Sequence, residues 1–145
     1  MILLTGATGF LGSQLLINLL DKKYEVVALK RTFSNTVRIS GVLKDKNLHL
    51  LDIDLLDYGE IFKMYSIDTI IHTANDYGRN ETPMFKILEA NLLLPLRLAE
   101  MGISKGVKIF INTDTFSNKG KSSHSILLDY SLSKKSLLFY LTKLS

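Results

Sequence analysis

Three glycines at a spacing of three, Gly6, Gly9 and Gly12, follow the first apolar stretch of the chain. Residues 1–5 (MILLT) form a short continuous apolar run, which is typical of a strand buried on both faces. Leucines at helical spacing follow the glycines as far as Leu20. A glycine-rich turn between a buried strand and a helix predicts that the chain opens with a βαβ unit.

Each glycine has its own task in such a turn. Gly6 makes the tight turn off the strand, Gly9 lets the backbone approach a pyrophosphate, and Gly12 packs the helix against the sheet. The N-terminus of the helix, at Phe10 and Leu11, supplies unpaired N–H groups to phosphates. We therefore predict that these five residues bind a dinucleotide; the alternative is a tight turn without a ligand.

Apolar runs alternate with helical patterns along the whole chain, and this alternation predicts an α/β fold, a parallel sheet with helices on both faces. A polar connection with a helical turn near 37–43 is expected after the second strand. Asp57 and Glu60 predict a capping box at the start of the following helix. Pro95 is expected to bend the longest helix. A loop is expected at 117–125. The predicted strands are 1–5, 25–29, 48–51, 69–73 and 107–112, and the predicted helices are 11–23, 57–65, 84–102 and 130–145.

Composition excludes several classes of function. The net charge is +4, but the Lys and Arg residues are spread out, so no nucleic-acid partner is expected. The absence of Cys excludes thiol nucleophiles and cysteine metal sites, and the three histidines show no metal-ligand spacing, so no metal is expected. Residues 1–20 are uncharged, yet they lack a basic start and are interrupted by polar residues, so we expect no membrane span and a cytoplasmic protein.

The residues after the second strand bear on the choice of cofactor. Proteins that bind NAD place an Asp or Glu about 20 residues after the glycines, where it accepts hydrogen bonds from the ribose 2′-hydroxyl. This chain has Lys30 and Arg31 there, with no acidic residue between Glu25 and Asp45. A basic pair suits a 2′-phosphate, so NADP(H) is favoured and NAD(H) remains open, as does a solvated basic pair without a ligand.

The chain resembles the extended short-chain dehydrogenase/reductase family, also described as the NAD-dependent epimerase/dehydratase family. The resemblance rests on TGATGFLG at 5–12, HTA at 72–74 and Y-x-x-x-K at Tyr130 and Lys134. It implies a Rossmann-type, doubly wound parallel sheet of strand order 3-2-1-4-5. It also implies supporting roles beyond the glycine turn: adenine contacts from Asp54 and Leu55, nicotinamide-side contacts from Thr73 and Ala74, and support of the active site by Asn91.

The same resemblance implies a catalytic set of Thr113, Tyr130 and Lys134. Reduction of a carbonyl needs a proton at the oxygen while hydride arrives at the carbon, and a Tyr hydroxyl can deliver it. Tyr130 and Lys134 are four residues apart, so they share one helix face. The ammonium, together with the positive ring of the cofactor, is expected to lower the pKa of the phenol. Lys134 would also hold the nicotinamide ribose, and Thr113 would orient the substrate oxygen.

Within the family, IIHTANDYG (70–78), ANLLLPLRL (90–98) and IFINTDTF (109–116) resemble the branch of CDP-abequose synthases. That branch implies NADPH-dependent reduction of the 4-keto group of a CDP-linked deoxy sugar in O-antigen synthesis. Thr115 stands where related dehydratases keep a Glu, which argues against water elimination. An NAD-dependent nucleotide-sugar 4-epimerase and a non-catalytic dinucleotide-binding module remain open.

The resemblance also concerns the extent of the chain. Residues 1–145 are expected to be one NAD(P)-binding domain that stops within the helix carrying Tyr130 and Lys134. The substrate-binding part would follow it, so the isolated chain is expected to bind cofactor without turnover. We expect the complete protein to form a homodimer.

Overall fold

The computed structural model describes residues 1–79, 81–115 and 125–144. They form two compact units. The first unit consists of Met1–Ala74 and Met101–Asn112, and the second of Asn75–Glu100 and Thr113–Ser145. Nearly all of the loop expected at 117–125 lies outside the described residues.

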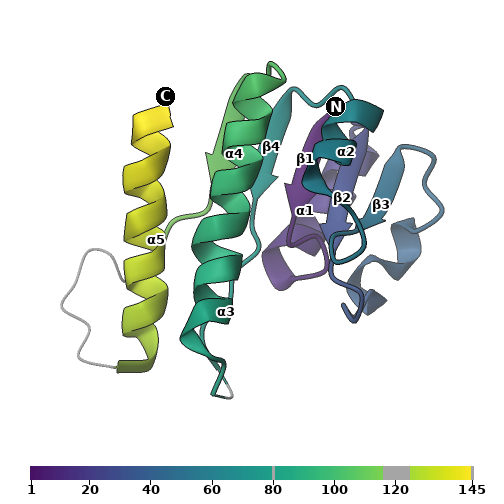
Figure 1. The fold of residues 1–145 in the computed structure, drawn as a ribbon. Helices are drawn as coiled ribbons and strands as arrows, with labels where there is room; N and C mark the ends of the chain where they lie inside the picture. The colour runs from purple at the N-terminus through teal and green to yellow at the C-terminus, as the bar shows by residue number, and fades with distance from the viewer. Residues whose placement is uncertain (80, 116–124, 145) are drawn as a thin grey trace. The chain divides into compact units, whose positions relative to one another are not determined.

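A parallel sheet forms the centre of the first unit. Its strand order is β3-β2-β1-β4-β5, and each neighbouring pair is parallel, which confirms the predicted order (Figure 1). The strands are β1 (Ile2–Thr5), β2 (Val26–Lys30), β3 (Leu48–Asp52), β4 (Thr69–His72) and β5 (Ile109–Asn112). Their carboxyl ends therefore lie at one edge of the sheet, where Rossmann-type folds bind ligands.

One face of this sheet is covered by α1 (Phe10–Asp21) and the 3₁₀ helix η1 (Val37–Val42). Leu16 and Leu20 of α1 and Ile39 of η1 share a buried core with Leu4 and Ala28 of the strands. The α1 helix begins directly after the glycine turn, and its leucine stripe points toward the strands. The sequence pattern predicted both the helix and the 3₁₀ turn.

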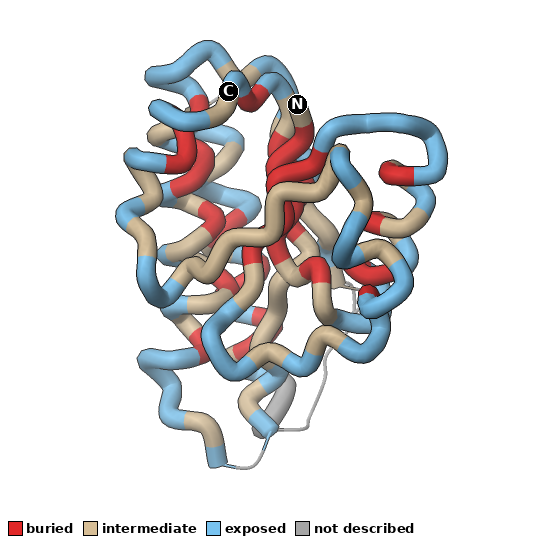
Figure 2. Tube along the Cα trace, turned by 90° about the vertical axis from the view of Figure 1, so that its right-hand side faces the viewer, coloured by how far each residue is buried: buried red, intermediate tan, exposed pale blue. Residues whose placement is uncertain are grey.

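The opposite face carries Leu3, Val27 and Ile70, which are fully buried. The last turn of α4 (Leu94–Ser104) reaches this face, because a Cβ on Gly102 would lie 3.0 Å from Cδ1 of Ile70. The α2 helix (Tyr58–Met64) lies in front of the strands in Figure 1, whereas α1 lies behind them. The first unit therefore has helices on both faces, and the buried stretches in Figure 2 include the strand that leaves the N-terminus.

The α2 helix (Tyr58–Met64) is capped by Asp57, whose side chain accepts the N–H of Gly59 at 2.7 Å. The predicted capping box is wrong in its second half. The Glu60 carboxylate pairs with Lys63 at 2.6 Å instead of returning to the Asp57 backbone. A lysine one turn along the helix competes for the carboxylate, since residues three apart are neighbours on the helix surface.

The second unit contains α3 (Met84–Leu88), the π-helical turn η2 (Glu89–Leu93) and the first part of α4. The helix predicted at 84–102 is thus present as three joined segments. Pro95 has no N–H to donate, and the preceding Leu94 N–H bonds to the carbonyl of Glu89, five residues back. The proline therefore changes the local hydrogen-bond pattern.

The last described element is α5 (Ser125–Leu144), which lies alongside α3 and η2 in the second unit (Figure 1). Its predicted start at residue 130 was wrong by five residues, because the polar residues before the helix led us to predict a loop where the first turn of the helix lies. Among the described residues, no helix combines the length and apolar character needed to cross a membrane.

Candidate functional sites in the two units

The glycine turn joins β1 to α1 at the carboxyl edge of the sheet. Gly6 has a φ of +71°, a backbone conformation that favours glycine, and its carbonyl accepts the N–H of Gly9 at 2.9 Å. Gly9 is the N-cap of α1, and no side chain caps the helix. The geometry agrees with the tight turn predicted at Gly6.

The turn packs closely against the end of β4. A Cβ on Gly6 would lie 2.6 Å from the backbone nitrogen of Ala74 and 2.7 Å from Oγ1 of Thr73. A Cβ on Gly12 would lie 2.7 Å from the carbonyl carbon of Gly6 and 2.8 Å from Oγ1 of Thr73. The structure therefore brings the predicted Thr73–Ala74 segment against the predicted glycine turn.

Thr5 connects the two strand ends, a role that the sequence analysis missed. Its hydroxyl accepts hydrogen bonds from the backbone N–H groups of Thr73 and Ala74 at 3.2 and 3.3 Å, and it lies 2.8 Å from Nδ1 of buried His72. The Thr73 hydroxyl in turn donates to the carbonyl of Thr5 at 2.7 Å. Thr5 and His72 therefore support the turn from the strands beneath it.

The start of α1 suits a pyrophosphate. No side chain caps it, and its first turn carries no acidic residue. A Cβ on exposed Gly9 would meet only the carbonyl of Gly6, at 3.2 Å, so the turn is open on its outer side. Phe10 and Leu11 beside it are exposed. Uncapped helix N–H groups and an open glycine backbone fit the phosphates of a dinucleotide.

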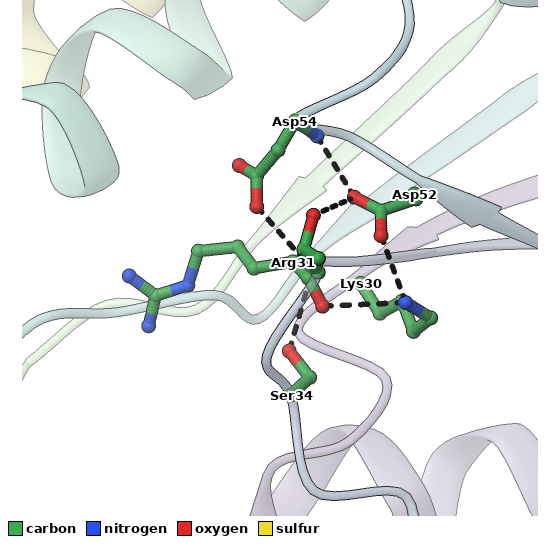
Figure 3. A network of polar contacts seen from close by, with 6 residues as sticks. Lys30, Arg31, Ser34, Asp52 and Asp54 are labelled. Atoms are coloured by element: carbon green, nitrogen blue, oxygen red, sulfur yellow. Dashed lines mark hydrogen bonds and ion pairs between the residues drawn. The ribbon is translucent and has the colours of Figure 1, made fainter.

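The two basic residues after β2 differ in their surroundings. Nζ of Lys30 forms an ion pair with Asp52 at 3.0 Å and bonds to the carbonyl of Arg31 at 3.4 Å. The Arg31 guanidinium extends away from this network in Figure 3 and is exposed. Lys30 is therefore neutralised by a carboxylate, whereas Arg31 presents its charge at the edge of the sheet.

Asp52 is the centre of this network. Desolvation raises its pKa, but hydrogen bonds from Lys30, from the backbone of Asp54 and from Thr32, together with the Lys30 charge, leave it below its ordinary value. The sequence analysis missed Asp52, although the register that pairs Lys30 with Asp52 on parallel strands contains the signal. The Asp52 carboxylate therefore stays charged at neutral pH and holds Lys30.

The predicted adenine contacts, Asp54 and Leu55, lie just beyond β3. The Asp54 carboxylate accepts the N–H of Thr32 at 2.8 Å, and this bond ties the segment after β3 to the segment after β2 (Figure 3). The Leu55 side chain is 77% exposed, so an apolar surface is available to a flat ring. The structure places both residues at the same sheet edge as Arg31.

In the second unit, the fully buried Asn91 connects two segments. Its Oδ1 accepts the N–H of Asp76 at 2.7 Å, and its Nδ2 donates to the carbonyl of Asp76 at 2.7 Å. Nδ2 also donates to the hydroxyl of Ser133 on α5, at 3.2 Å. Asn91 therefore fixes the backbone at Asp76 relative to the helix that carries Tyr130, which agrees with the supporting role implied for it.

Tyr130 and Lys134 lie on the buried side of α5, at 5% and 1% exposure. The Ser133 hydroxyl between them donates to the carbonyl of Tyr130 at 2.7 Å. Desolvation lowers the pKa of Lys134 to about 8, while the charge of Asp114 acts in the opposite direction. Lys134 is thus a buried ammonium near a carboxylate, and it titrates close to neutral pH.

The expected lowering of the Tyr130 pKa is not what the structure shows. Burial raises that pKa, and Tyr77 and Asp114 raise it further; only a hydrogen bond with Thr115 lowers it. The physical reason is that the phenol is desolvated, while an aromatic hydroxyl and a carboxylate face it. Neutral Tyr130 is therefore the stable form at neutral pH, and a neutral phenol is a proton donor.

Thr113, the third predicted catalytic residue, is half-buried and directly follows β5. Thr115, two residues further along the chain, hydrogen bonds to Tyr130, a contact that the sequence analysis did not predict. The described part of the chain contains no group of three or more metal-ligating side chains close enough to hold a metal ion.

A family model described as the NAD dependent epimerase/dehydratase family matches residues 2–136. The chain belongs to this family. The description of the family names NAD, which agrees with the dinucleotide predicted at the glycine turn.

Individual relatives support nucleotide-sugar chemistry in the family. A CDP-abequose synthase from Salmonella muenchen is 36% identical over 134 residues, which cover 92% of this chain and 44% of that protein. The solved UDP-glucuronic acid 4-epimerase from Bacillus cereus in complex with NAD has a TM-score of 0.80 at 25% identity, over 99% of this chain and 51% of that one. The UDP-Glc/GlcNAc 4-epimerase from Campylobacter jejuni has a TM-score of 0.82 at 23% identity, over 99% and 48%. The chain thus spans about half the length of these relatives.

We expect Gly12→Ala to destabilise the protein by about 3 kcal/mol, because the added methyl group would collide with the backbone of Gly6. The matched control is Gly41→Ala, since a Cβ at Gly41 meets nothing within 4 Å. Urea unfolding followed by circular dichroism measures both free energies. Equal stabilities of the two variants would contradict the close packing of the turn.

We expect Lys134→Met to stabilise the protein at pH 7 by about 1–3 kcal/mol, because it removes a buried ammonium. The folded-state pKa of Lys134, about 8, lies below the ordinary value of 10.5. Between these values the unfolded state binds more protons, so Lys134 makes the wild type more stable as pH rises.

The advantage of Lys134→Met should therefore be full below pH 8 and disappear by about pH 10.5. Thermal and urea unfolding at a series of pH values measure it. The exposed neighbour Lys135 supplies the control variant Lys135→Met, which should show no such trend. A pH-independent difference for Lys134→Met would contradict the burial of a charged amine.

Proposed function

We propose that the protein reduces the 4-keto group of a CDP-linked deoxy sugar with NADPH. The observation that carries the proposal is the buried, neutral Tyr130 on α5, in a chain 36% identical to a CDP-abequose synthase. A neutral phenol donates a proton to a ketone oxygen, whereas a reaction that starts by oxidising an alcohol needs a phenolate base. The state of Tyr130 therefore favours reduction.

The proposed reaction adds a hydride and a proton to the 4-keto group. NADPH, when bound, supplies hydride to carbon 4. Tyr130 gives its phenolic proton to the oxygen of carbon 4, which yields the alcohol and leaves a phenolate. Lys134, one helical turn along the same face, stabilises this phenolate as an ammonium, and Thr113 orients the ketone oxygen through its hydroxyl. Solvent then returns the proton to Tyr130.

Residues of the first unit would hold the cofactor. The open glycine turn and the uncapped start of α1 would take the pyrophosphate, with Thr73 and Ala74 beside them. Leu55 would offer its exposed surface to the adenine. Arg31 would bind the 2′-phosphate, because its guanidinium is exposed and suits bidentate contacts to phosphate oxygens.

A 4-epimerase that uses NAD is the second candidate. It is favoured by the similarity to the Bacillus cereus epimerase in complex with NAD and by the ion pair that neutralises Lys30. An epimerase of this type would retain NAD and interconvert nucleotide sugars without net oxidation. Cofactor preference and the need for external NADPH therefore distinguish the two candidates.

The cofactor proposal predicts that Arg31→Asp weakens NADPH binding tenfold to a hundredfold and leaves NADH binding unchanged, a loss of about 1.5–3 kcal/mol. Lys30→Ala should weaken NADPH binding less, because Asp52 already holds Lys30. Isothermal titration calorimetry measures both cofactors. The control is Arg38→Asp, which makes the same charge change at another exposed site of the first unit. Equal weakening of NADH and NADPH by Arg31→Asp would argue against a 2′-phosphate site.

The reaction itself is tested with the complete protein and a CDP-linked 4-keto-3,6-dideoxy sugar. NADPH oxidation at 340 nm should accompany formation of the 4-hydroxy sugar, and Tyr130→Phe should lower kcat by about 10²–10⁴-fold because it removes the proton donor. NADPH affinity should survive in that variant. Tightly held NAD together with epimerisation of a UDP-sugar would instead establish the second candidate.

A further inference from the structure

Tyr77 lies against Tyr130 in the second unit. The two ring centroids are 4.7 Å apart and the ring planes are inclined by 36°, so the rings are tilted and in contact. The Tyr77 ring is 43% exposed, whereas Tyr130 is 5% exposed. Tyr77 is therefore the solvent-exposed member of the pair, and its ring covers one side of the buried Tyr130 ring.

The position of Tyr77 is fixed from two sides. The guanidinium carbon of Arg79 lies 5.4 Å from the centroid of its ring, within the range of a cation–π contact. The preceding residue, Asp76, is held through its backbone by Asn91, whose Nδ2 also donates to Ser133 on α5. These contacts orient the Tyr77 ring toward α5.

We propose that Tyr77 is a positioning residue for Tyr130: its ring packs on the phenol ring and its hydroxyl hydrogen bonds to the phenol, so that Tyr130 is held as a proton donor. The inference rests on the proposed role of Tyr130, but the contact itself can be tested without substrate. It gives Tyr77 a function in the reaction.

The groups around the phenol agree with this role. The Tyr77 hydroxyl acts on Tyr130 both by hydrogen bond and by charge, and both effects raise the Tyr130 pKa. Asp114 raises that pKa as well, and the hydrogen bond with Thr115 opposes the rise. Desolvation lowers the pKa of Lys134 on the same helix, and the charge of Asp114 acts in the opposite direction. Removal of the Tyr77 hydroxyl therefore leaves a more acidic Tyr130.

The experiment is ¹⁹F NMR of protein labelled with 3-fluorotyrosine, titrated with base in the absence of substrate. The Tyr130 resonance is identified by its loss in Tyr130→Phe. In Tyr77→Phe, which keeps the ring, we expect the midpoint of the Tyr130 titration to move to lower pH. In Tyr77→Leu, which removes the ring, we expect the same direction of shift with a broadened Tyr130 resonance. Tyr140→Phe, farther along α5, should leave the midpoint unchanged.

Kinetics provide the second readout. If Tyr77 acts through Tyr130, Tyr77→Phe should move the alkaline limb of the kcat profile to lower pH while KM stays constant. A Tyr130 midpoint that is the same in wild type, Tyr77→Phe and Tyr77→Leu would overturn the inference, whatever the enzyme reduces. A shifted midpoint without any ketoreduction would support the inference and count against the proposed function instead.

Discussion

The close approach of β1 and β4 at their carboxyl ends is the constraint on which the first unit depends. The Thr5 hydroxyl accepts two backbone N–H groups from the chain beyond β4, which brings Thr73 and Ala74 against the glycine turn. This leaves no space for a side chain at Gly6 or Gly12. The turn is thus shaped by the strands beneath it, and the uncapped start of α1 follows from that shape. The dinucleotide site proposed here would therefore be a consequence of how two parallel strands end.

The second unit depends in the same way on one buried amide. Asn91 uses both atoms of its amide group, on the Asp76 backbone and on Ser133, so a connecting segment and α5 are held by a single side chain. Tyr77 lies on the connecting segment and Tyr130 on α5, and their rings are in contact. The burial that makes Tyr130 a neutral phenol also makes Lys134 a weakened base. Both shifts share one cause, the removal of water from one face of α5.

The fold could be predicted because its signals are local. The apolar runs, the leucine stripe of α1 and the glycine spacing each specify an element, and their order specifies the parallel sheet. The site could be predicted only in part. Lys30 and Arg31 look alike in the sequence, and only the register of β2 with β3 shows that Asp52 holds one of them. The direction of the Tyr130 pKa was mispredicted for a similar reason: helical spacing placed Lys134 nearby, but it said nothing of Asp114, Tyr77 or the loss of water.

The π-helical turn at Glu89–Leu93 has a consequence for how the length of this segment can vary. A π turn contains one residue more than an α turn, so deletion of a single residue here would restore α-helical winding through the turn. The segments on either side would keep about the same orientation about the helix axis, because the π turn already accommodates the additional residue. Asn91 lies inside the turn, so its place on the helix surface would change and its hydrogen bonds to Asp76 and Ser133 would be lost. Natural variants and engineered relatives should therefore tolerate substitutions in this turn more readily than a change in its residue count.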